Sequence, residues 1–240
     1  MKQNREIKVE DLTSSPTCGK PLVMGSTVFN EDCMTVMARY PDKFFDLAIV
    51  DPPYGMIKNT YGSGSKGIKA NFDCHKHNHR EWDIKPSIEY TKELQRVSKN
   101  QIIWGANHFI SIVPFDSSCW LVWDKDNTGD FADCELAWTS FNTAVRKFTW
   151  RWNGMLQQNM KQKEERIHPT QNPVALYDWV FQQYTKQGNL ILDTHLGSGS
   201  SRIAAHKHNL EFVGCEIYAE YFAAQEARIK EYTSQLRLFG

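Results

Sequence analysis

Four consecutive residues combine groups that could act on a planar amine, namely Asp51, Pro52, Pro53 and Tyr54. The apolar run over 47–50 predicts a buried parallel strand, so the four residues follow its carboxyl end, where open α/β sheets have their ligand crevice. Both prolines lack a backbone N–H, and the residue before each proline disfavours the helical region, so the chain leaves the strand extended. The segment therefore presents a carboxylate, the Pro52 carbonyl and the Tyr54 ring.

These groups suit the exocyclic amino group of adenine or cytosine, whose lone pair is delocalised into the ring. Hydrogen bonds from both N–H groups to Asp51 and to the Pro52 carbonyl would localise that lone pair for attack on an electrophilic methyl group. A base inside a duplex cannot reach such a site, so it must be flipped out and stacked, and Tyr54 is suited to that. The alternative is a strand end followed by a Pro-Pro turn with a surface tyrosine.

The length and composition predict one globular domain. A chain of 240 residues is long enough for a single α/β domain, and we expect a polar N-terminal arm over 1–24 and one domain over 25–240 with a loop insertion over 55–85. Lys plus Arg equals Asp plus Glu, at 28 each, so any contact with nucleic acid needs a local patch. No apolar run is long enough for a membrane span, and six scattered cysteines without a C-x-x-C pair fit reduced thiols in a cytoplasm.

Two segments of the expected loop match ligand-binding motifs in residue pattern but lack the structural context of those motifs. Residues 62–67 read G-x-G-x-x-G, but no strand precedes them and no helical pattern follows, so we expect a flexible loop over the active site. Residues 74–79 alternate Cys and His with other residues, without the second ligand pair that a tetrahedral site needs. We therefore expect no metal site.

A second glycine-rich segment has the context that the first one lacks. Residues 193–200 follow a predicted strand over 189–192 and precede a predicted helix over 201–208, so their backbone can approach a ligand at a helix N-terminus. The next predicted strand ends in Glu216, which is placed to bind two ribose hydroxyls. This pattern indicates a nucleoside-bearing cofactor; NAD, a nucleotide and S-adenosylmethionine stay open, and the missing Lys-Ser/Thr phosphate cradle disfavours ATP.

Basic and aromatic residues alternate over 145–167, before the His-Pro segment at 168–173. Such interleaving suits phosphate contacts and base stacking. The candidate DNA contacts are Arg146, Lys147, Trp150, Arg151, Trp152 and Lys161. The alternative is a solvated hairpin of 133–140 with 144–150, and a loop, whose tryptophans pack inward. The position beside a base-modifying site favours DNA.

Four segments together resemble the S-adenosylmethionine-dependent DNA amino-methyltransferases of the N6-adenine and N4-cytosine type. They are residues 51–54, 168–173, 193–199 and 213–216, in the order of the permuted group whose catalytic motif precedes its cofactor motif. The resemblance covers most of the chain, from about Val28 to Ile229. It implies a circularly permuted, Rossmann-like α/β methyltransferase fold, with a mostly parallel seven-stranded sheet and helices on both faces.

The resemblance also implies roles for individual residues. Asp51, Pro52, Pro53 and Tyr54 would be catalytic, and the Asp at position 51 goes most often with adenine N6. The turn would bind the methionine and sulfonium end of S-adenosylmethionine, Glu216 the ribose, and Asp32 would lie near the adenine. The residues of the turn that would bind the cofactor are Asp193, His195, Gly197, Ser198 and Gly199. The residues that would lie on the side of the cofactor's carboxylate are His168, Pro169, Thr170 and Gln171.

The chain departs from the family pattern at three places. His195 stands where the family usually has Phe, Asn172 where it has Lys, and Tyr218-Ala219 where it has Asp-Pro. The resemblance implies double-stranded DNA as partner, no membrane, and a prokaryotic or phage-encoded protein in the cytoplasm. Because the recognition segment is short, a homodimer stays open. Other readings are a cytosine N4 enzyme, an RNA methylase, a catalytically silent DNA-binding subunit and, least favoured, an NAD-dependent oxidoreductase.

Overall fold

The computed structural model describes residues 25–55, 83–127, 132–153 and 156–236. The expected arm over 1–24, most of the expected loop over 55–85, and the segments 62–67 and 74–79 lie outside these ranges. Across the described ranges, every helix is too short or too polar to cross a bilayer.

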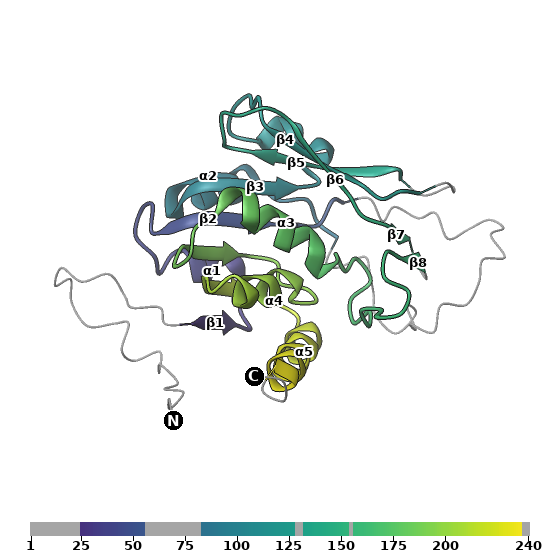
Figure 1. Cartoon of the computed structure of the whole chain (residues 1–240). Helices are drawn as coiled ribbons and strands as arrows, with labels where there is room; N and C mark the ends of the chain where they lie inside the picture. Colours follow the sequence, from purple (N-terminus) through teal and green to yellow (C-terminus); the bar gives the residue numbers. More distant parts are fainter. Residues whose placement is uncertain (1–24, 56–82, 128–131, 154–155, 237–240) are drawn as a thin grey trace, which may run out of the picture.

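An eight-stranded mixed sheet forms the centre of the protein (Figure 1). Its strand order is β1-β10-β9-β2-β3-β5-β4-β6, and every neighbouring pair is parallel except those that involve β5. The strands are β1 (Ser26–Phe29), β2 (Phe45–Val50), β3 (Ser98–Trp104), β4 (Trp120–Asp124), β5 (Cys134–Thr139), β6 (Arg146–Thr149), β9 (Leu190–Asp193) and β10 (Glu211–Cys215). A separate antiparallel pair joins β7 (Trp152–Asn153) and β8 (Leu156–Gln157).

Helices cover both faces of this sheet. The helices are α1 (Cys33–Met37), α2 (Ile88–Val97), α3 (Val174–Tyr184), α4 (Ser200–Lys207) and α5 (Ala219–Leu236), with 3-10 turns at η2 (Ala106–His108) and η3 (Ile110–Ile112). Figure 1 shows α3 and α4 side by side in front of the sheet, with α5 beyond α4. Successive side chains of a strand point to opposite faces of the sheet, so the residues of β2 contribute to two hydrophobic cores. Leu47 and Ile49 pack with α3 and α4, whereas Ala48 and Val50 pack with α1 and α2.

The central strand β2 is buried along nearly its whole length, as its continuous apolar sequence predicts. It lies between β9 and β3, at the place where the strand order changes direction. The chain runs from β2 to β3 on one side, and from β9 to β10 on the other. Such a switch point opens a crevice at the carboxyl ends of the strands. Asp51 follows β2 directly at this edge.

The predicted hairpin of residues 133–140 with 144–150 is wrong. Strand β5 pairs with β3 and β4, and β6 pairs in parallel with the far side of β4. The connection over 141–145 does not turn tightly, because Ser118, just ahead of β4, donates to the Asn142 side chain and to the Thr143 carbonyl. This contact carries the chain past β4, and β6 becomes the eighth strand beyond the seven that were expected.

Candidate active site

One cavity of about 700 Å³ lies at the carboxyl ends of β2, β9 and β10. It brings together the residues that follow β2 and the residues of the second glycine-rich turn, which are far apart in the sequence. The expected site residues that line it are Asp32, Asp51, Pro52, Pro53, Tyr54, His168, Pro169, Thr170, Gln171, His195, Gly197, Ser198 and Glu216. A pocket of this size is ample for a small-molecule ligand.

Both carboxylate oxygens of Asp51 accept a hydrogen bond from a neighbouring side chain. The Tyr54 hydroxyl donates to Oδ1 at 2.6 Å, and Nδ2 of Asn172 donates to Oδ2 at 2.8 Å. Burial raises the pKa of Asp51 to about 7, and the negative charge of Glu135 adds to the rise, while the two donors oppose it. Asp51 is therefore held in one orientation and titrates near neutrality.

The ring of Tyr54 is fixed by close packing. It stacks on His108, with 4.9 Å between ring centroids and an interplanar angle of 21°. It also packs on Gly105, which follows β3 and has a φ of +66°. A Cβ added at Gly105 would lie 1.9 Å from a Tyr54 ring carbon, so only glycine allows this approach. Burial raises the pKa of the Tyr54 phenol, and the Asp51 charge raises it further, so it stays a donor.

The glycine-rich turn and Glu216 hold each other in place. Oε2 of Glu216 accepts from the Gly197 backbone N–H at 3.0 Å, and Oε1 accepts from the Tyr218 N–H at 2.9 Å. Gly197 and Gly199 have φ values of +48° and +71°, a region that favours glycine, and Gly199 precedes the first turn of α4. Burial raises the pKa of Glu216, and the backbone donors oppose that rise.

Asp193 and Gly199 are expected site residues that do not line the cavity. Asp193 is buried beneath the turn, where Oδ1 accepts from the His195 N–H and Oδ2 from the Ser201 hydroxyl. Burial raises its pKa to about 6. Asp193 therefore shapes the backbone of the turn from below.

His195 faces the cavity as a neutral ring. Burial lowers its pKa to about 4, so the imidazole is uncharged at neutral pH. Thr194 Oγ1 lies 2.9 Å from Nδ1 of His195 and 2.6 Å from the buried Tyr90 hydroxyl. The Tyr90 ring meets the imidazole edge-on, with a centroid distance of 5.5 Å. His195 thus takes the place of an aromatic residue without bringing a charge.

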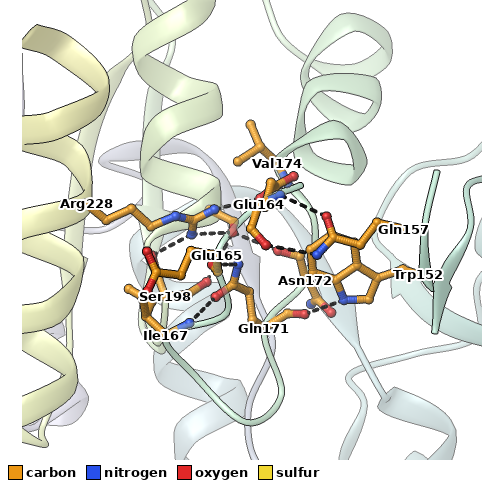
Figure 2. A network of polar contacts seen from close by, with 11 residues as sticks. Trp152, Gln157, Glu164, Glu165, Ile167, Gln171, Asn172, Val174, Ser198 and Arg228 are labelled. Carbon is orange, nitrogen blue, oxygen red and sulfur yellow. Dashed lines mark hydrogen bonds and ion pairs between the residues drawn. The ribbon is translucent and has the colours of Figure 1, made fainter. Parts of the chain in front are cut away.

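A polar network holds the His-Pro segment in place (Figure 2). Glu164 accepts from the Val174 N–H at the start of α3 and from Arg228 of α5. Gln171 accepts from the Ile167 N–H and donates to the Glu165 carbonyl, while its own carbonyl accepts from Nε1 of Trp152. The network joins α5, α3 and the β7-β8 pair around the segment that carries Gln171 and Asn172.

Several lining residues were not expected from the sequence. Lys125 and Glu135 form an ion pair in the cavity wall, because β4 and β5 pair antiparallel with Trp123 opposite Glu135. Asn172 and Tyr177 also line the cavity, and Nδ2 of Asn172 lies 3.4 Å from the Tyr177 hydroxyl. Asn172 could have been found, since it stands in a conspicuous segment. Lys125 and Glu135 have no local signal, because their contact depends on the pairing of β4 with β5.

The expected DNA-contact residues are only partly on the surface. Arg146, Lys147, Arg151 and Lys161 are exposed, with Lys147 paired to Asp124 and Arg151 to Asp126. The expectation that Trp152 offers an exposed stacking face is wrong, because Trp152 is buried and lines the cavity. Trp150 is half-buried and stacks on Phe148, which in turn stacks on Trp179. The inward-packing alternative therefore describes the tryptophans better.

Comparisons with known proteins find similarity to DNA methylases. A family model described as DNA methylase, of the N6/N4 type, matches residues 120–227. The type II methyltransferase M.HinfI of Haemophilus influenzae is 25% identical over 252 residues, covering 86% of this chain and 68% of that protein. The putative methylase YubD of Escherichia coli (strain K12) is 24% identical over 221 residues, covering 82% of this chain and 87% of that protein.

Solved structures show the same fold. The M1.HpyAVI–SAM complex has a TM-score of 0.54 and 20% identity, covering 85% of this chain and 99% of that chain. The cytosine-N4-specific PvuII DNA methyltransferase has a TM-score of 0.57 and 12% identity, covering 85% and 86%. These matches confirm the expected Rossmann-like methyltransferase fold class. The family match over 120–227 adds that this chain is similar to the N6/N4 DNA methylases.

Proposed function

We propose that this protein is an S-adenosylmethionine-dependent DNA methyltransferase that acts on the exocyclic N6 of adenine. One observation carries the proposal. Asp51 and Tyr54, which suit a flipped amino base, line the same cavity as Gly197 and Glu216, which suit a nucleoside cofactor. Residues 51–54 lie outside the segment that the family model matches, so their assignment depends on this geometry.

The cavity suits S-adenosylmethionine, which the related M1.HpyAVI carries in its solved structure. Carboxylates of Asp32 and Glu216 line the wall, as does Glu31, which pairs with Arg39, and the His195 imidazole in the same wall is neutral. The carboxylates of Asp32 and Glu216 favour a ligand that carries a sulfonium and an ammonium group. Glu216 would bind the ribose hydroxyls, and Gly197 and Ser198 would contact the methionine end. S-adenosylmethionine supplies an electrophilic methyl group and a thioether leaving group.

The residues after β2 act on the amine of the flipped base. Each carboxylate oxygen of Asp51 can accept a second hydrogen bond besides the one it has, so one amine N–H can bind there. The Pro52 carbonyl would accept the other N–H. Two acceptors draw the amine nitrogen toward a tetrahedral shape and localise its lone pair. Tyr54, held by His108 and Gly105, would stack on the base.

Asp51 also offers a place for the proton that the amine must lose. As the nitrogen gains a bond to carbon it becomes positively charged, and it returns to neutrality by giving up one N–H proton. A carboxylate with a pKa of about 7 stabilises the developing charge and can hold that proton before water takes it. The ionised form of Asp51 is therefore the active form.

Adenine is favoured over cytosine because the acidic residue at the head of the 51–54 segment goes most often with adenine N6 in the family that the sequence resembles. The fold does not separate the two bases, since the PvuII enzyme is cytosine-N4-specific. The test incubates the protein with methyl-labelled S-adenosylmethionine and mixed-sequence duplex DNA, then identifies the labelled nucleoside after digestion. Labelled N6-methyladenine would support the proposal. Labelled N4-methylcytosine would show that the target base is cytosine, and DNA without label would contradict the methyltransferase activity.

Replacing Glu135 with glutamine is expected to extend activity to lower pH. The Glu135 charge helps to raise the pKa of Asp51, so removing that charge lowers this pKa and keeps Asp51 ionised as the pH falls. The measurement is the acid limb of kcat against pH, which should move downward. Glu93→Gln, at a surface pair with Arg96 on α2, is the matched control. An acid limb that stays in place or moves upward contradicts the assignment of that limb to Asp51.

We place the DNA backbone along the exposed basic residues of 145–167, and Arg151→Ala is expected to weaken binding. Loss of one phosphate contact should reduce the slope of log K against log salt by about 1. Lys99→Ala is a matched control, because both side chains are 48% exposed and paired with an aspartate. Lys99 lies at the amino end of β3, whereas Arg151 follows the carboxyl end of β6. Binding is measured by titrating labelled duplex at several salt concentrations. If both variants show the same slope of log K against log salt, Arg151 does not contact the DNA backbone.

A further inference from the structure

We propose that Asn172 is the positioning residue of the amine site, and that it aims the Asp51 carboxylate at the reacting nitrogen. This inference rests on the proposed methyl transfer and adds a residue to it. Asn172 stands where the resembling family usually has lysine, and the resemblance gives it no role.

The contact between Asn172 and Asp51 is direct and partly buried. Nδ2 of Asn172 lies 2.8 Å from Oδ2 of Asp51, across 121 residues of sequence, and Asn172 is only 8% exposed. Tyr54 holds Oδ1 from the other side. The two donors fix the plane of the carboxylate, since rotation of the group would break both hydrogen bonds. The lone pairs left on the carboxylate are thereby directed to one place in the cavity.

Asn172 is itself held firmly at both of its polar ends. Its backbone carbonyl accepts from the Ser200 hydroxyl at 2.7 Å, at the first residue of α4. Its second amide hydrogen can reach the Tyr177 hydroxyl at 3.4 Å on α3. Neighbouring Gln171 is fixed by the network of Figure 2, in which its carbonyl accepts from Trp152. A positioning residue has to be more rigid than the group it positions, and these contacts supply that rigidity.

The same contacts tie the amine site to the glycine-rich turn. Arg228 of α5 donates to the Ser198 carbonyl and to the Ser200 hydroxyl, and Ser200 donates to Asn172, which donates to Asp51. A chain of hydrogen bonds thus runs from the backbone of the cofactor-side turn to the acceptor of the amine. A shift of about 1 Å in either part costs catalysis, so a shared support for both has a clear use.

Asn172 also affects the charge of Asp51. The titratable groups that face Asp51 are Tyr54 on its own segment, Glu135 on β5, Tyr177 on α3 and Asp193 at the end of β9. Burial and the two carboxylates raise the pKa of Asp51, and only the donors Tyr54 and Asn172 lower it. Loss of the amide donor therefore leaves more of Asp51 protonated at neutral pH, and the protonated form neither stabilises the positive charge on the amine nor takes its proton.

The test compares Asn172→Ala and Asn172→Asp with the unaltered protein. Alanine removes the donor, and aspartate keeps the side-chain shape but replaces the donor by a second carboxylate. Asn142→Asp makes the same chemical change at an exposed asparagine that accepts a hydrogen bond from Ser118 and does not line the cavity, and it serves as the control. For each protein we would measure the thermal unfolding midpoint, the Kd for S-adenosylmethionine, and kcat for duplex DNA as a function of pH.

We expect kcat at neutral pH to fall about ten- to hundredfold in Asn172→Ala, the usual effect of losing a hydrogen bond to a charged group. The acid limb of kcat should move to higher pH, and further in Asn172→Asp, so that part of the rate returns in alkaline buffer. A merely structural role would lower kcat by the same factor at every pH. That result, or an unchanged kcat, would overturn the role of Asn172 and leave the methyltransferase proposal standing. If the unaltered protein transfers no methyl group to DNA, both proposals fail together.

Discussion

Asp51→Ala is expected to lower kcat for methyl transfer by about a thousandfold, the range seen when one group that stabilises developing charge is removed. Asp51 is the only acid that our mechanism places on the amine, and Tyr54 and Asn172 both orient it. Within the described ranges, no hydrogen bond joins the Asp51 side chain to Gly197 or Glu216, so the Kd for S-adenosylmethionine should change less than about threefold. A large loss of kcat with intact cofactor affinity is the pattern of a group needed only in the transition state.

The measurement is a single turnover with excess protein, cofactor bound beforehand and labelled duplex DNA added last. This order separates the chemical step from binding and from product release. Asp42→Ala is the control, since Asp42 is an exposed aspartate paired with Arg96 ahead of β2. Methylation by Asp51→Ala at the rate of the control would show that the acceptor lies elsewhere. A loss of cofactor affinity equal to the loss of rate would instead make Asp51 part of the cofactor site.

The parts of the site that the sequence predicts well are those built from neighbouring residues. The continuous apolar run over 47–50 predicts the strand β2, and all six of its residues are buried or half-buried. The Pro-Pro segment fixes the direction in which the chain leaves this strand. The turn with Gly197 and Gly199 is predicted by strand, glycine and helix signals in succession. In both cases the local backbone preference and the final structure agree, so a single sequence suffices.

The parts that sequence reasoning missed depend on pairing between distant segments. Residues 133–140 and 144–150 were predicted to form a hairpin, and nothing local reveals that β5 inserts between β3 and β4. That insertion puts Glu135 beside Lys125 in the cavity wall and raises the pKa of Asp51. Asn172 stands out in the sequence as a departure from the family pattern. Its contact with Asp51 depends on how β2 and the start of α3 lie in the fold, and the sequence does not show this.

Replacement of Gly105 should have the second-largest effect. In Gly105→Ala the added Cβ would overlap the Tyr54 ring, with ring carbons at 1.9 and 2.3 Å. The ring must move, and it would lose its stacking on His108 and the hydrogen bond from its hydroxyl to Asp51. We expect kcat to fall about a hundredfold through lost positioning. We also expect a loss of about 2–4 kcal/mol in the free energy of unfolding, from overpacking and from a non-glycine residue in the left-handed region.

Gly188→Ala separates these two causes of destabilisation. Gly188 has a φ of +80°, close to that of Gly105, but an added Cβ there meets no atom within 4 Å. It should cost about 1 kcal/mol and leave kcat unaffected. Unfolding in urea and single-turnover kinetics measure the two effects. The decisive variant adds Gly105→Ala to Tyr54→Ala, where no ring stands in the way: there Gly105→Ala should destabilise no more than Gly188→Ala does. If it still costs the full amount, the clash with Tyr54 is not the cause, and Gly105 has no part in placing that ring.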